Sequence, residues 1–499
     1  MVMWIVLAVY LVVMLAIGFY CRHLSNTVSD FVLGGRTLGP WMTAFAYGTS
    51  YFSAVVFVGY AGTFGWKYGV AATWVGIGNA VIGSLLPWLI LGNRTRIMTK
   101  HLDAKTMPEF FEKRYDSKGL KITSALIIFV FLIPYTASVY NGLSRLFKMA
   151  FNIPYEWCII GMAVFTAIYV IVGGYKATAM NDFLQGIFML VGIVAVIYAA
   201  ISGKGGLVTA LKDLGEQGEF NTILGPDPIN LIGVVILTSL GTWGLPQMVQ
   251  KFYAIKDKKA VKLGTIISTI FALVVAGGSY FLGGFGRLFA SADQVAANGT
   301  DYIVPTIIET MPDILIGVVL VLVLSASMST LSSLVLTSAS TLTIDLIKPF
   351  SKKMNDKKQV VVMRILIAVF LLISVGIAIF TITNPKTIIS TLMSISWGAL
   401  AGAFLAPFLY GLFSKKVTKS AVWTSFILGV GLVIAHMIYF TLCGHKLTLW
   451  GITIDSAINC GAIVMLLSLI VVPIVSLITP KMSKEKTDII FDCYGKEAK

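Results

Sequence analysis

Long apolar stretches recur along this chain, and each is close to the ~20 residues that an α-helix needs to cross a lipid bilayer. Only 12% of the 499 residues are charged, against about 25% in soluble domains. The sequence therefore predicts an all-α polytopic membrane protein with a transmembrane domain over residues 1–480 and a short, mobile cytoplasmic tail over 481–499. Thirteen spans are expected, at 3–21, 41–64, 70–92, 121–149, 156–173, 178–202, 229–250, 262–285, 312–342, 361–383, 387–412, 420–443 and 456–478.

The net charge of +15 is distributed unevenly between the loops. Lys and Arg gather in every second connection, including Lys251–Lys262, which is the positive-inside pattern. With an odd number of spans, this pattern places the N-terminus outside and the C-terminus in the cytoplasm. The compact loops and the lack of glycosylation-rich regions suit a bacterial inner membrane. Anionic lipid headgroups account for the charge, so no nucleic-acid partner is expected.

The sequence offers no residues for catalysis or ATP hydrolysis. It lacks a Walker A motif, HExxH and any Ser/His/Asp constellation. Its five cysteines and four histidines are not spaced as metal ligands. We therefore expect neither an enzyme nor an organic cofactor.

The stretch from Val323 to Thr341 is apolar enough to span a membrane, yet it is rich in hydroxyl groups. Ala326, Ser329, Thr330 and Ser333 follow one another at i, i+3, i+4 and i+7, so they share one helix face. Two interpretations stay open from these residues alone. Small and hydroxylated residues let helices pack closely in a bilayer, and neighbouring oxygens can replace the water of a hard cation such as sodium.

Two predicted spans contain helix-breaking residues near their middle. The second span contains Gly48 and Ser53, and the seventh contains Gly244-Leu245-Pro246. Breaks five spans apart indicate an inverted repeat with a midplane site, here over residues 41–202 and 229–412. Glycine and proline are also common in membrane helices that have no such role.

Asp182 is the most notable acid within an apolar segment, at the start of the sixth span. A carboxylate in this position requires a partner or a cation. The alternative from the sequence is that Asn181 and Asp182 cap a helix N-terminus.

Several motifs in order resemble the sodium:solute symporter family over nearly the whole chain: residues 30–41 (DFVLGGRTLGPW), 50–54 (SYFSA), 173–186 (GGYKATAMNDFLQG), 244–247 (GLPQ) and 325–333 (SASMSTLSS). The resemblance implies a LeuT-type five-plus-five repeat of spans 2–6 and 7–11, with one leading and two trailing helices. It also implies one or two co-transported sodium ions.

Carried over to this sequence, the family's main sodium site corresponds to the carbonyls of Thr49, Phe52 and Ala326 and the hydroxyls of Ser329 and Thr330. A second sodium position, present in some relatives, would combine Asp182 with Ser329, Ser332 and Ser333. The substrate wall implied by the resemblance comprises Ser50, Tyr51, Ser53, Tyr135, Ser138, Tyr140, Asn141, Thr242, Trp243 and Gln247.

Within the family, the motifs are more similar to pantothenate carriers than to proline carriers. Proline carriers have Asp where this chain has Tyr51, and aromatic residues where Thr238 and Thr242 stand. The resemblance therefore favours sodium-coupled symport of a small, carboxylate-bearing, pantothenate-like solute by a monomer in contact with membrane lipids. The alternatives are a sodium/proline or other amino-acid symporter, a proton-coupled carrier, a passive channel or uniporter, and a transporter-like solute sensor.

Overall fold

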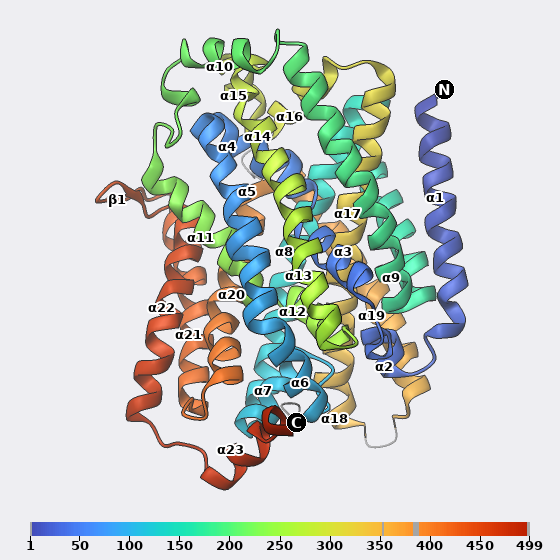
Figure 1. The fold of residues 1–499 in the computed structure, drawn as a ribbon, viewed down its shortest axis with the longest axis vertical. Helices are drawn as coiled ribbons and strands as arrows, with labels where there is room; N and C mark the ends of the chain where they lie inside the picture. Colours follow the sequence, from blue (N-terminus) through green and yellow to red (C-terminus); the bar gives the residue numbers. More distant parts are fainter. Residues whose placement is uncertain (1, 352–353, 383–388, 497–499) are drawn as a thin grey trace.

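The structure is a computed structural model that describes residues 2–351, 354–382 and 389–496. It is a bundle of α-helices, most of which run along its long axis (Figure 1). Within the described ranges the only sheet is a small hairpin of β1 (Thr448–Leu449) and β2 (Ile452–Thr453). The two termini lie at opposite ends of the bundle (Figure 1), as the predicted topology requires. Which end faces the cytoplasm stays a prediction.

The first half of the chain forms α1 (Val2–Tyr20), α2 (Val28–Leu33), α3 (Pro40–Tyr51), α4 (Ala61–Tyr68), α5 (Thr73–Ala80), α6 (Asn93–His101), α7 (Met107–Tyr115), α8 (Lys118–Phe151) and α9 (Tyr155–Ser202). The middle of the chain forms α10 (Leu207–Gly215), α11 (Pro228–Gly244), α12 (Pro246–Ala254), α13 (Lys258–Ala272), α14 (Gly278–Gly284), α15 (Ala292–Asn298) and α16 (Ile303–Glu309). The rest forms α17 (Asp313–Thr341), α18 (Lys348–Phe350), α19 (Asp356–Ile382), α20 (Ile389–Phe413), α21 (Lys419–His436), α22 (Ala457–Ile478), α23 (Lys484–Phe491) and α24 (Cys493–Lys496).

Ten helical stretches of the described chain are long and apolar enough to cross a membrane, or eleven when the bent pair α11–α12 counts as a span. Two of them, Val55–His101 and Tyr155–Ser202, have 47 and 48 residues, about twice the length of one span. Each contains a glycine with positive φ, Gly69 at 64° and Gly174 at 57°, where the helical path is interrupted. The all-α polytopic class is confirmed, whereas the count of thirteen spans is not. The predicted span ends at 383 and 387 lie outside the described residues.

Helix α17 runs through the middle of the bundle, where it packs against α1, α3, α8, α9 and α19. Every residue from Val319 to Thr341 is buried. A helix that is apolar nearly all round is stable only when it is covered on all sides. Many of its hydroxyls bond to carbonyls one turn earlier, as Ser327 does to Val323 at 2.7 Å, which satisfies them inside the apolar interior.

The two predicted helix breaks are both present. Helix α3 ends at Tyr51, and Phe52 is extended with φ −93° and ψ 120° before a π-helical turn begins at Val55. Helices α11 and α12 are separated by Leu245, also extended, and they meet at an angle of 46°. The prediction that both spans unwind near their middle is therefore confirmed.

The tail differs from the mobile segment that we expected from its charge. Helix α23 lies on the end of the bundle that carries the C-terminus (Figure 1). Lys486 pairs with Asp116, and Lys415 pairs with Asp488. These ion pairs hold the pKa of both carboxyls below the usual value, because each accepts a hydrogen bond from its lysine. The last residues, 497–499, lie outside the described part.

Candidate functional site

The break after α3 exposes backbone carbonyls to α17. In a continuous helix, the carbonyls of Thr49, Ser50 and Phe52 would accept hydrogen bonds from later amides of the same helix. Because Phe52 is extended, these oxygens are released in the interior of the bundle. The C-terminal end of a helix also carries partial negative charge, which favours a cation.

The hydroxyls of Ser329 and Thr330 in α17 lie beside these released carbonyls. Ser329 Oγ donates to the Thr49 carbonyl at 3.0 Å. Thr330 Oγ1 lies 3.4 Å from the Thr49 oxygen, 3.4 Å from that of Ser50, 3.5 Å from that of Phe52 and 3.0 Å from that of Ala326. All these residues are buried. Thus the five residues expected at the main sodium site lie together.

The donor set fits a sodium ion. Its oxygens are neutral carbonyls and hydroxyls from two elements, the kind of ligand that hard cations prefer. Burial among apolar side chains removes competing water. The assignment of the ion itself stays a prediction.

Asp182 lies in the interior of the bundle rather than at a helix end. It follows the interruption at Gly174 by more than two helical turns of α9. A capping carboxylate lies in the first turn, so helix capping does not explain its position. Lys251 of α12 provides its charge partner, with Nζ 4.0 Å from Asp182 Oδ2. The Lys251 ammonium also donates to Ser333 Oγ at 2.9 Å, and Ser333 Oγ lies 2.7 Å from Ser50 Oγ.

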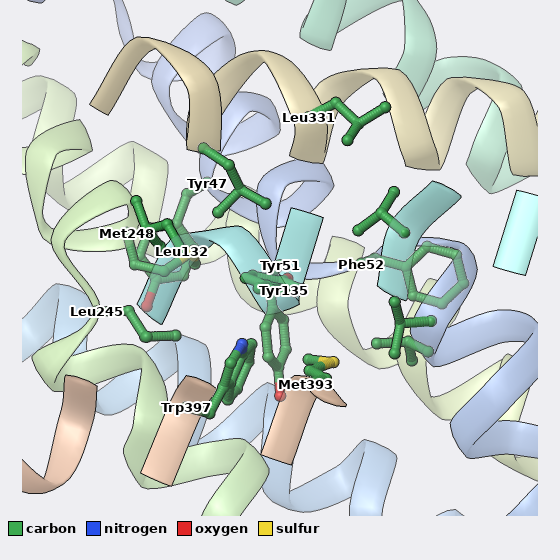
Figure 2. Close-up of a cluster of buried hydrophobic side chains, with 14 of the residues drawn as sticks. Tyr47, Tyr51, Phe52, Leu132, Tyr135, Leu245, Met248, Leu331, Met393 and Trp397 are labelled. Atoms are coloured by element: carbon green, nitrogen blue, oxygen red, sulfur yellow. The ribbon is translucent and has the colours of Figure 1, made fainter. Parts of the chain in front are cut away.

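Three aromatic side chains meet between the two helix breaks (Figure 2). The Tyr51 ring stacks on Trp397 with centroids 5.9 Å apart, and Tyr135 meets the same indole edge-on at 5.9 Å. Gly241 of α11 leaves room for the indole of Trp397, since a Cβ at position 241 would lie 2.7 Å from the Trp397 ring. Leu245, Met248 and Met393 lie around this aromatic cluster (Figure 2).

Polar atoms without partners are found among the same residues. In the described structure, Tyr135 Oη, Trp397 Nε1 and both amide atoms of Gln247 are buried and make no hydrogen bond. Buried polar groups are rarely left unpaired. These atoms are therefore candidates for contact with a polar solute.

Other residues expected in the substrate wall bond elsewhere. Thr242 Oγ1 donates to the Gly83 carbonyl at 2.9 Å, and Trp243 Nε1 to the Ile82 carbonyl at 2.8 Å. Asn141 Nδ2 donates to Thr381 Oγ1 at 2.9 Å. Ser50 Oγ contacts Ser333 Oγ, and Ser53 Oγ accepts a hydrogen bond from the amide of Val55. Ser138 Oγ donates to the carbonyl of Tyr135 within α8. In the described residues, Tyr140 Oη is buried without a hydrogen-bond partner.

Two residues of this region were not predicted. Lys251 belongs to a segment that we counted as a basic loop, whereas it lies inside α12, one turn after Gln247. Its place as the one charged residue in the run from Pro246 to Ile255 could have indicated burial. Trp397 stands alone among small residues in α20, and no spacing in the sequence connects it with Tyr51.

The aromatic cluster is closed off from both ends of the bundle. Tyr51, Tyr135 and Trp397 are all buried. At the end that carries the C-terminus, the Arg36 guanidinium donates to carbonyls of Tyr253 and Ala104, and to both oxygens of Thr99. At the other end, Thr63 Oγ1 contacts Thr300 Oγ1 at 2.7 Å. Access to this cluster from either side of the bundle requires one of these ends to open.

Comparison with known proteins identifies relatives over most of the chain. The osmoregulated proline transporter OpuE of Bacillus subtilis is 31% identical over 435 residues, which cover 86% of this chain and 87% of that protein. A sodium/proline symporter of Staphylococcus aureus is 29% identical over 468 residues, 90% of this chain and 88% of that protein.

Solved structures share the fold at low sequence identity. A substrate-bound, outward-open Na⁺-coupled sialic acid symporter superposes with a TM-score of 0.77 at 17% identity, over 97% of this chain and 99% of that one. A transporter of the nucleobase-cation-symport-1 family has a TM-score of 0.52 at 14% identity, over 94% and 99%. The LeuT-type fold is therefore confirmed.

The family relationship follows from the broadest of these matches. The sodium:solute symporter family matches residues 31–429, a range that contains both helix breaks, α17 and the Lys251–Asp182 pair. The chain belongs to the sodium:solute symporter family.

Proposed function

We propose that this protein imports a small carboxylate-bearing solute together with sodium, by alternating access, and that L-proline is the first solute to test. The observation that carries the proposal is the convergence of the Thr49, Ser50 and Phe52 carbonyls on the hydroxyls of Ser329 and Thr330. A sodium ion bound there is held by the break after α3 and by α17 together.

Such an ion couples two parts of the bundle. The predicted repeats cover residues 41–202 and 229–412, and α3 and α17 belong to different repeats. A ligand shifts a conformational equilibrium only by its difference in affinity for the two states. A sodium ion that needs oxygens from both elements binds the state in which they are close, and loses ligands when the repeats move apart. Sodium thereby stabilises the form that accepts solute.

The solute site that we propose lies at the Tyr51–Trp397–Tyr135 cluster beside the two breaks. None of the side chains labelled in Figure 2 carries a formal charge. A solute carboxylate would instead meet the partial positive charge at the start of a half-helix, where anions are favoured. The aromatic faces suit a compact apolar body.

L-Proline has this combination of a carboxylate and a small ring. The two relatives named above are a proline transporter and a sodium/proline symporter. They give no support to the pantothenate branch that the motifs favoured. This chain still differs from proline carriers in having Tyr51 where they have Asp. Other amino acids therefore belong in the same panel of solutes.

We place the protein in the bacterial inner membrane, with the N-terminus outside and the C-terminus in the cytoplasm. Its partners are the solute and the surrounding lipids. A single chain supplies both elements of the sodium site and all three helices of the aromatic cluster, so we propose that the monomer is the working unit.

The test is uptake of radiolabelled solutes into proteoliposomes that contain the full chain. The panel contains L-proline, other amino acids, pantothenate and sugars, each with an inward sodium gradient, with potassium in place of sodium, and with a proton gradient alone. We expect uphill uptake that requires sodium, is lost in Ser329→Ala/Thr330→Ala, and is kept in Ser327→Ala. The Ser327 hydroxyl bonds only to its own helix, so it is a matched control.

The other outcomes distinguish the alternatives. Uptake driven by the proton gradient without sodium would identify a proton-coupled carrier. Uptake that never exceeds equilibrium would identify a uniporter. Uptake that requires sodium but survives the double substitution would contradict the proposed ion site.

A further inference from the structure

A buried lysine lies where the resemblance places a second sodium ion. Lys251 extends from α12 toward α9 and α17, and only about 2% of its side chain is exposed. Its ammonium lies 4.0 Å from Asp182 Oδ2, 2.9 Å from Ser333 Oγ and 5.2 Å from the centre of the Tyr175 ring. Two of these three neighbours, Asp182 and Ser333, are expected ligands of that ion.

The serines Ser332 and Ser333, both expected ligands, make hydrogen bonds to other groups. Ser332 Oγ donates to the Ser329 carbonyl of its own helix at 2.9 Å. Ser333 Oγ is shared between the Lys251 ammonium and Ser50 Oγ. Ser332 keeps its lone pairs, but an ion bound to Ser333 would have to displace the Lys251 ammonium from that oxygen.

The charges of the site also balance without an ion. One carboxylate faces one ammonium, and both side chains are almost completely buried. A sodium ion added to this pair would leave one positive charge uncompensated in the membrane interior, where unpaired charge is costly. Within the described residues, Lys251 is the only basic group within 4.0 Å of Asp182.

We propose that the ammonium of Lys251 takes the place of the second sodium ion, so that this protein binds and carries one sodium ion per cycle. Lys251 is a cation tethered covalently to α12, and it neutralises Asp182. This proposal rests on the proposed function in one respect only, namely that the site at Ser329 and Thr330 binds the single transported ion.

The hydrogen bond from Lys251 to Ser333 also connects to the main sodium site at Ser329 and Thr330. Ser50, which Ser333 contacts, follows Thr49 directly and contributes a carbonyl near Thr330. The lysine therefore also fixes the serine pair that connects α17 to the break after α3. A neutral residue at 251 would free Asp182 to recruit a mobile cation in its place.

The experiment counts sodium ions bound to the purified full chain at equilibrium, with ²²Na⁺ and no solute. We expect one ion per wild-type protein. Lys251→Met, which is similar in length and uncharged, should bind two ions, and Lys251→Met/Asp182→Asn should return to one. Lys251→Arg keeps the positive charge and should bind one.

The first site serves as the folding control for these variants, because a misfolded protein would bind no ion at all. Two ions on the wild type, one of them lost in Asp182→Asn, would overturn this inference while the proposed function stands. A folded Lys251→Met protein that binds one ion would also overturn it. If the wild type binds no sodium, the proposed function itself fails.

Discussion

Replacement of Thr330 by valine removes one hydroxyl from the candidate sodium site and preserves the shape of the side chain. That hydroxyl lies 3.0 to 3.5 Å from four carbonyl oxygens, those of Thr49, Ser50, Phe52 and Ala326. A contact between a hydroxyl and a charged group contributes about 1.5–3 kcal/mol. Since 1.4 kcal/mol is a factor of about ten, we expect the sodium dissociation constant to rise by roughly 10- to 150-fold.

The measurement is ²²Na⁺ binding to purified protein, displaced by unlabelled NaCl, which needs no knowledge of the solute. Thr330→Ser keeps the hydroxyl and should bind sodium within a few-fold of the wild type. Ser327→Ala removes an equally buried hydroxyl of α17 that bonds to Val323 instead. Its sodium affinity should be unchanged, which separates loss of a ligand from general loosening of the helix.

Equal affinities in Thr330→Val and Ser327→Ala would refute the reasoning, because the two differ in their contact with the break after α3. A fall in thermal stability of both variants by similar amounts would not explain a difference in binding. Protection by sodium against heating, which follows from binding to the folded state alone, should disappear in Thr330→Val over the same concentration range.

Three further changes test other parts of the bundle. Trp397→Phe reduces the aromatic surface beside Tyr51 and Tyr135 on which the proposed solute packs. Since an aromatic contact contributes about 0.5–1.5 kcal/mol, loss of this contact with the solute should raise half-saturation of uptake roughly 2- to 12-fold while sodium binding stays unchanged. Arg36→Gln removes hydrogen bonds that close the end of the bundle that carries the C-terminus. It should speed thiol labelling at Thr337→Cys, a buried position of α17 that contacts Gln250 of α12, in a protein whose native cysteines have been replaced. Hydrogen bonds from Lys486 and Lys415 lower the pKa of Asp116 and of Asp488, respectively. The stability that these ion pairs contribute is present above the unfolded pKa of about 4 and is lost as pH falls through the folded pKa. Amide exchange in α23, corrected for intrinsic rate, should therefore be faster at pH 3.5 than at pH 6. Exchange that does not change with pH would show that the ion pairs do not hold the tail.

Local signals in the sequence predicted the features that depend on a single segment. The period of Ala326, Ser329 and Thr330 defines a helix face wherever that helix packs. Glycine and proline interrupt a helix through their own backbone chemistry, so the breaks near Phe52 and Leu245 were visible before any tertiary contact was known. The family motifs then predicted that these segments meet.

Two contacts between distant segments were missed. The pair of Lys251 and Asp182 joins two helices that no periodicity relates. Lys251 also begins a run of basic residues that the positive-inside pattern explains equally well. Trp397 lies in α20, far along the chain from Tyr51. The span count differs because interruptions at Gly69 and Gly174 leave helical stretches of double length.

The extended residue Phe52 lies near the middle of the path that runs from Pro40 to Tyr68. An ion bound there has crossed about half of the bilayer before any domain moves. A full crossing corresponds to about 2.3 kcal/mol per charge at 100 mV, so half corresponds to roughly 1.2 kcal/mol, or about sevenfold in affinity. The resting potential of a cell would thus tighten sodium binding from outside by itself, and part of the transported charge would move in the binding step.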